Sequence, residues 1–165
     1  MGTGQYIRVS PDLELYYEEA GQGTPLIFIP GWAGTTEFYA HQMAHFGLNY
    51  HVLTYDPRSQ GRSSKTLENN HYAQHGKDLN AFIDALNLQD VVLVALSAGC
   101  YDIYAYLRAF GTDNVKACIF IDEMPKAVAA RKGSACGPGP RPARSCARRA
   151  PPGDAPAPRP GAAWR

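Results

Sequence analysis

The chain has 165 residues, of which 45% are hydrophobic and 11% aromatic, enough for one globular domain with a buried core. This composition excludes collagen-like and fully disordered chains, and no apolar run approaches the roughly 20 residues that a membrane-spanning helix needs. The first residues do not form a signal-peptide pattern. We therefore expect a soluble, cytoplasmic protein with no membrane partner.

The net charge of +1 hides a sharp difference between two segments. Residues 1–127 carry eight Lys and Arg against fourteen Asp and Glu, whereas residues 128–165 carry eight against one. The second segment is mostly Ala, Gly, Pro and Arg, residue types with GC-rich codons that are typical of a message read in a shifted frame. It lacks the apolar side chains that a core requires, and its scattered arginines disfavour nucleic acid as a partner. The sequence predicts a folded unit over 1–127 and a disordered low-complexity tail over 128–165.

Hydrophobic periodicity gives the order of the elements. Residues 5–9 and 13–19 alternate apolar and polar side chains around a Pro-Asp turn, as in a β-hairpin. Short continuous apolar runs predict buried strands, and apolar spacings of three and four predict helices. The predicted strands are 26–29, 51–55, 90–96 and 115–121, and the predicted helices are 38–46 (after a Thr35-Thr36 cap), 72–88 and 98–110. This alternation predicts the α/β class, with a doubly wound, mostly parallel sheet covered by helices on both faces.

Ser97 stands at the end of the most apolar predicted strand and just before a predicted helix. Most of its neighbours from Ala95 to Gly99 are small, and a strand that turns sharply into a helix has no room for large side chains there. This context is typical of a nucleophile elbow, which raises a serine Oγ at the carboxyl end of a sheet, above a helix N-terminus. The alternative is that Ser97 only caps the helix.

A second turn, Pro30-Gly31-Trp32, follows the predicted strand at 26–29. Its glycine lets the backbone bring the next N–H groups towards the mouth of the sheet. The backbone N–H groups of Trp32 and Ala98 are then candidate oxyanion-hole donors, aimed at the oxygen that becomes negative when a serine attacks a carbonyl. The alternative is an ordinary turn that ends a strand.

Two further clusters have structural interpretations. The loop from Asp56 to Ser63 follows a predicted strand, and we expect a partly buried ion pair between Asp56 and Arg58 to brace it. His71 and His75 are four residues apart near a helix start, but no third ligand accompanies them. We expect an exposed helical face there and no metal site.

The Pro30-Gly31 turn, the loop that begins at Asp56 and the Ser97 turn, in this order, resemble the α/β-hydrolase family. The resemblance covers residues 5–127 and is closest to haloperoxidase/perhydrolase and small serine esterase members. It implies a serine hydrolase that acts on a small ester or a related small-molecule acyl substrate and needs no cofactor.

Two alternative functions stay open on the same fold. The Pro-Gly-Trp sequence is also similar to that of cofactor-independent ring-cleaving dioxygenases, which makes a dioxygenase-like member one alternative. A non-catalytic homologue that binds a ligand or a protein is the other.

In the family, an acid and a histidine follow the serine in the chain. All five histidines of this chain precede Ser97, so we expect an incomplete fold, truncated after its sixth strand, with little or no turnover. Asp122 and Glu123 follow the predicted strand at 115–121, where some members carry the acid. In such a truncated fold that strand is an exposed apolar edge, which favours self-association.

Overall fold

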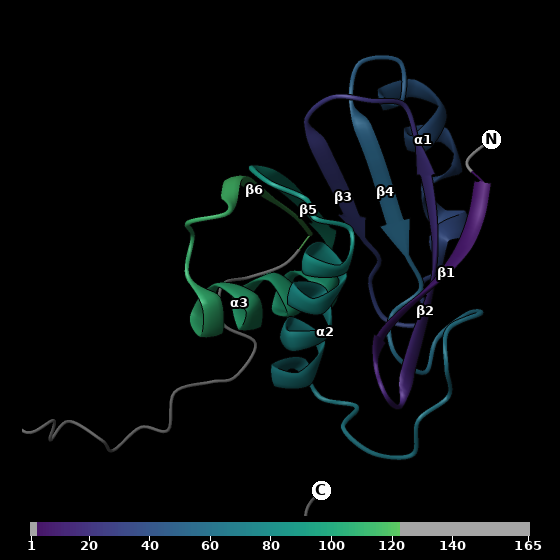
Figure 1. Cartoon of the computed structure of the whole chain (residues 1–165), viewed down its shortest axis with the longest axis vertical. Coiled ribbons are helices and arrows are strands. Elements are labelled where there is room, and N and C mark those ends of the chain that lie inside the picture. Colours follow the sequence, from purple (N-terminus) through teal and green to yellow (C-terminus); the bar gives the residue numbers. More distant parts are fainter. Residues whose placement is uncertain (1–2, 123–165) are drawn as a thin grey trace, which may run out of the picture. The chain divides into compact units, whose positions relative to one another are not determined.

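The structure, a computed structural model, describes residues 3–122 of the chain (Figure 1). Those residues form a six-stranded sheet with the strand order β1-β2-β4-β3-β5-β6. The strands are β1 (Thr3–Ser10), β2 (Leu13–Ala20), β3 (Pro25–Ile29), β4 (His51–Tyr55), β5 (Val91–Leu96) and β6 (Val115–Ile121). The helices are the 3-10 turn η1 (Thr36–Tyr39), α1 (Ala40–Phe46), α2 (Tyr72–Ala85) and α3 (Gly99–Phe110). The predicted order of strands and helices is confirmed, and the predicted tail over 128–165 lies outside the described residues.

The sheet is mixed: two antiparallel strands form one side, and four parallel strands form the centre and the opposite edge. β1 and β2 pair as the predicted antiparallel hairpin, and β2 pairs antiparallel with β4. β4, β3, β5 and β6 run parallel to one another, which confirms the predicted mostly parallel sheet. Because β4 and β5 flank β3, the carboxyl ends of these three strands meet at the same end of the sheet. The loops that follow them are therefore brought together there, where open α/β sheets bind their ligands.

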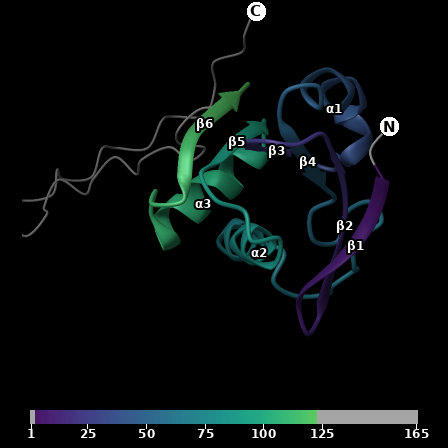
Figure 2. The same ribbon diagram turned by 45° about the horizontal axis from the view of Figure 1, so that its top comes forward.

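Alternate residues of the central strands face two separate cores. Ile27 and Ile29 of β3 belong to a large cluster that includes apolar residues of α2 and α3. Leu26 and Phe28 belong to a second cluster, which includes Met43 of α1. Figure 2 shows α2 and α3 on one side of the sheet and α1 on the other. Because both faces of β3 are buried, its sequence is a continuous apolar run rather than an alternating one.

The helix predicted over 38–46 is present but begins with the tighter turn η1. Thr35 occupies the N-cap position, but its side chain makes no capping hydrogen bond. Phe38 is largely exposed, whereas Tyr39 is buried and its hydroxyl donates to the carbonyl oxygen of Ile29 at 2.9 Å. A 3-10 turn has fewer residues per turn than an α-helix, so the residues of η1 that face the sheet do not follow α-helical spacing.

β6 forms an edge of the described sheet, where its pairing partner is β5. Its residues Ile119, Phe120 and Ile121 are between 37% and 48% exposed. The predicted exposed apolar edge is therefore present in residues 3–122. No helix in this part of the chain combines the length and the apolar character needed to cross a membrane.

Candidate active site

Ser97 lies in a strained turn between β5 and α3. Its φ is 50°, in the left-handed region, which costs a residue with a side chain about 1 kcal/mol or more. Backbone hydrogen bonds hold this conformation, because the Ser97 N–H donates to the oxygen of Ile121 at 2.8 Å and the Cys100 N–H donates to the oxygen of Ser97 at 2.9 Å. The chain passes from strand to helix within two residues, and Ser97 is left partly exposed at the carboxyl end of β5.

The turn after β3 packs directly against the Ser97 turn. A Cβ atom at Gly31 would lie 3.3 Å from the Cβ of Ser97 and 3.1 Å from the oxygen of Leu96. A Cβ atom at Gly99 would lie 2.5 Å from the oxygen of Pro30, too close for any side chain. Both glycines are therefore explained by the close approach of two backbones, one from each turn.

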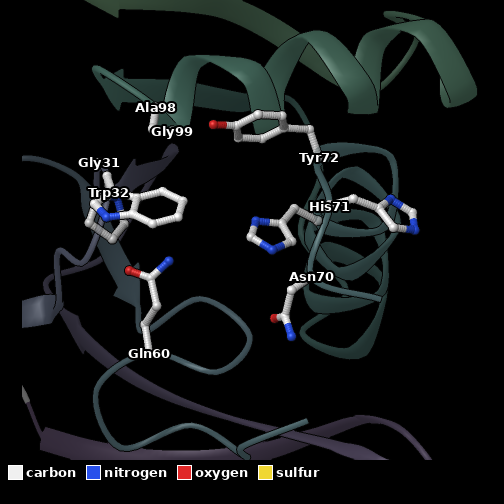
Figure 3. Close-up of a pocket in the computed structure, with 10 residues that line it drawn as sticks. Gly31, Trp32, Gln60, Asn70, His71, Tyr72, Ala98 and Gly99 are labelled. Carbon is white, nitrogen blue, oxygen red and sulfur yellow. The ribbon is translucent and has the colours of Figure 1, made fainter. Parts of the chain in front are cut away.

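The two turns border a cavity of about 110 Å³, shown in Figure 3. Its lining residues are Pro30, Gly31, Trp32, Gln60, Asn70, His71, Tyr72, His75, Ala98 and Gly99. Figure 3 shows Trp32 and Gln60 across the cavity from Asn70, His71 and Tyr72. A second cavity of about 280 Å³ shares Trp32, Gln60, Asn70 and His75 with the first. The structure thus brings Trp32 and Ala98, the two candidate backbone donors, to one cavity beside Ser97.

The predicted ion pair between Asp56 and Arg58 is wrong, although both side chains are buried. Asp56 accepts hydrogen bonds from the backbone N–H groups of Thr36 and Arg62, both at 2.7 Å. Arg58 turns towards α2, where its Nε and Nη2 donate to the two carboxylate oxygens of Asp78 at 2.8 Å each. The carboxylate of Asp78, on the facing helix, meets the planar guanidinium group with two parallel hydrogen bonds. The carboxylate of Asp56, two residues earlier in the same loop, does not. The loop is still braced as predicted, because both side chains tie it to neighbouring elements.

The expectation of an exposed helical face holds for His71 and is wrong for His75. His71 is exposed at the N-cap of α2, where its Nδ1 accepts a hydrogen bond from the Gln74 N–H at 3.2 Å. The side chain of His75 is only 14% exposed and faces Asp102 of α3 in an ion pair, with Nδ1 and Oδ1 3.2 Å apart. Sequence reasoning missed this pair. The available signal was Asp102, a charged residue next to the apolar Ile103 on the buried face of α3, where a carboxylate needs a partner. Residues 3–122 contain no group of three or more His, Cys, Asp or Glu arranged to hold a metal ion.

Burial changes the ionisation of both members of this pair. It raises the pKa of the Asp102 carboxyl above its usual value. Burial also opposes the charge on His75, but the contact with Asp102 and the nearby charge of Asp78 outweigh it and raise the pKa of His75 above 6.5. A histidine with a shifted pKa therefore lines the cavity, which is a common property of functional sites.

Of the two predicted acids, only Asp122 lies among the described residues. It follows Ile121, whose carbonyl oxygen accepts the Ser97 N–H, so Asp122 adjoins the Ser97 turn. Asp122 is exposed and has a φ of 57°. Glu123 lies outside the described residues, and the role of either residue as an acid stays a prediction.

Known proteins are similar to this chain over part of their length. A non-heme chloroperoxidase of Kitasatospora aureofaciens, CPO-A1, is 29% identical over 114 residues, which cover 68% of this chain and 42% of that protein. The structure of a bromoperoxidase from Bacillus anthracis is 31% identical, with a TM-score of 0.68 over 72% of this chain and 44% of that one. An esterase from Exiguobacterium antarcticum, EaEST, is 26% identical, with a TM-score of 0.68 and the same two shares.

This chain spans less than half the length of each of these proteins. The family model of the alpha/beta hydrolase fold matches residues 24–132. That range contains the four parallel strands, the turn after β3 and the Ser97 turn. We conclude that the chain belongs to the α/β-hydrolase family.

Proposed function

We propose that the chain carries Ser97, the nucleophile of a serine hydrolase whose substrate is a small ester or a related acyl compound. The observation that supports this most strongly is the left-handed conformation of Ser97 between β5 and α3. A nucleophile elbow has this strained strand-turn-helix geometry because it exposes the serine Oγ at the end of the sheet. Membership of the family adds support, and the similar esterase favours an ester as substrate.

The backbone N–H groups of Trp32 and Ala98 are the proposed oxyanion hole. When Oγ of Ser97 attacks a carbonyl carbon, the π electrons of the C=O bond move to the oxygen, which becomes negative. Donors that are fixed in place before the reaction stabilise this charge without reorganising. Trp32 and Ala98 line the cavity beside Ser97, and the close packing of Gly31 against Ser97 keeps their two turns together.

The proton of the Ser97 hydroxyl needs an acceptor, and the family places a histidine for this purpose after the nucleophile. All five histidines of this chain come before Ser97. We therefore propose that the 165-residue chain turns over little or no substrate. Asp122, which adjoins the Ser97 turn, and Glu123 are the proposed acids.

A fluorophosphonate reagent tests the nucleophile directly. The serine oxygen attacks the phosphorus and displaces fluoride while its proton passes to water, a reaction that is slow without a base. The oxyanion hole alone still accelerates the attack, so slow labelling of Ser97 in preference to the other serines is expected. Ser97→Ala should remove the label, whereas Ser10→Ala, a change at the end of β1, should leave it. An unlabelled Ser97 in a folded chain would overturn this proposal and favour the non-catalytic, ligand-binding alternative.

Two further proposals rest on the edge strand and on composition. The exposed apolar side chains of β6 support self-association through that edge. The difference in composition supports a domain boundary after residue 127.

A further inference from the structure

A groove of about 490 Å³ lies between α2 and α3, the two helices that Figure 2 shows on one face of the sheet. The helices approach closely at Gly76, where a Cβ atom would lie 2.7 Å from the carbonyl carbon of Ala105. Small side chains line part of the groove and leave room in it, namely those of Ala73, Ala105 and Ala109. Its volume falls within the range of about 300–1,000 Å³ that is typical of sites for small molecules.

The groove has an aromatic end and a cationic end. The rings of Tyr72 and Tyr101, each in the first turn of its helix, lie 5.0 Å apart. Gly76 and Ala105 meet one turn further along both helices, so α2 and α3 run in the same direction. Along that direction the lining residues are first Tyr72, Tyr101 and Tyr104, and then Lys77 and Arg108. At a rise of about 1.5 Å per residue, the two ends are about 6–8 Å apart.

The two cations have no carboxylate partner among residues 3–122. Three arginines of this part of the chain form ion pairs, namely Arg8, Arg58 and Arg62, whereas Lys77 and Arg108 form none. The acidic residues of the two helices do not line the groove; these are Asp78, Asp84 and Asp102. Residues 1–127 carry fourteen acidic residues against eight basic ones, so two unpaired cations in one groove run against the overall charge. They favour an anionic occupant.

The aromatic end adds a second requirement, since tyrosine rings pack well against another ring. We propose that the groove binds an arylalkyl carboxylate, whose ring contacts Tyr72 and Tyr101 and whose carboxylate lies between Lys77 and Arg108. The planar guanidinium of Arg108 can meet both oxygens of a carboxylate, and a short alkyl chain covers the distance between the two ends. Tyr72 also lines the candidate active-site cavity, so the groove adjoins that cavity. The binding does not depend on whether Ser97 is a nucleophile.

We would measure the binding of 4-fluorohydrocinnamate and of its primary amide to the full chain by ¹⁹F NMR. The two compounds have nearly the same shape and differ in charge, since a carboxyl with a pKa near about 4 is ionised at about pH 7. Two exposed ion pairs predict about fivefold tighter binding of the carboxylate at low salt. The preference should vanish at about 1 M salt, where the screening length falls to about 3 Å. Equal affinities at low salt would overturn the proposal.

Competition tests the aromatic part of the proposal. Cyclohexanepropionate has the charge and nearly the size of hydrocinnamate but no π system. It should displace the fluorinated carboxylate about threefold less well than hydrocinnamate does. Equal displacement by the two would show that the groove accepts any apolar carboxylate and would overturn the choice of an aromatic occupant.

Variants then assign the preference to the two cations. Lys77→Gln/Arg108→Gln removes both charges at exposed positions and should abolish the preference for the carboxylate over the amide. Lys116→Gln is the matched control, because Lys116 is an exposed residue of β6 that does not line the groove. That variant should keep the preference, as should Ser97→Ala. A preference that survives in the double variant, or one that is lost in Lys116→Gln, would overturn the proposal.

Discussion

Replacing Asp78 by alanine removes the main partner of a buried arginine. The side chains of Arg58 and Asp78 are 2% and 6% exposed and share two hydrogen bonds of 2.8 Å. The remaining partner, Asp12, lies at 3.2 Å with its own side chain 59% exposed, so it compensates weakly. Breaking a buried pair from one side costs about 3–5 kcal/mol, because the other charge stays buried. This is a large part of the total of about 5–15 kcal/mol that holds a typical domain folded.

Urea denaturation followed by circular dichroism measures this loss. Glu14→Ala is the matched control, because the ion pair between Arg8 and Glu14 is exposed and should contribute less than about 1 kcal/mol. The double variant Arg58→Met/Asp78→Leu should lose less stability than Asp78→Ala, since it leaves no charge unpaired. Equal losses for Asp78→Ala and Glu14→Ala, or a larger loss in the double variant, would refute this reasoning.

Three other predictions concern the turn, the buried pair and the edge strand. Gly99→Ala should lower the free energy of unfolding by about 1–3 kcal/mol, because its Cβ would meet the oxygen of Pro30; an unchanged urea midpoint would contradict the close backbone contact. The raised pKa of His75 contributes stability that is fully present below pH 6.5 and is lost as pH rises through the folded-state pKa. The free energy of unfolding of the wild-type chain, measured with urea, should therefore fall as pH rises over this range, relative to that of His75→Phe/Asp102→Asn. Parallel pH profiles of the two chains would argue against the ion pair. Ile119→Lys places a charge on the exposed edge and should abolish concentration-dependent association in sedimentation velocity, whereas a monomeric wild-type chain would exclude self-association through β6.

The sheet could be predicted from the sequence because burial leaves a local pattern. In β3, successive residues such as Ile27 and Phe28 face two different cores, so both must be apolar. The Ser97 turn could be found for a similar reason. A sharp passage from strand to helix restricts the residues beside Ser97 to small ones, and Gly99 shows the restriction directly.

The partners of charged side chains could not be predicted in the same way. Asp56 and Arg58 are neighbours in sequence, but Arg58 pairs with Asp78, twenty residues further along the chain. His75 likewise finds Asp102 on another helix. Local periodicity predicts that such residues lie on a helix or a loop. Only the packing of α2 against α3 and against the loop after β4 decides which charges meet.

A crystal structure of the fluorophosphonate adduct would test the central claim most directly. The account predicts a covalent bond from Oγ of Ser97 to phosphorus, with the phosphoryl oxygen within hydrogen-bond distance of the backbone N–H groups of Trp32 and Ala98. An adduct on another residue, or a phosphoryl oxygen that contacts neither N–H group, would contradict the account.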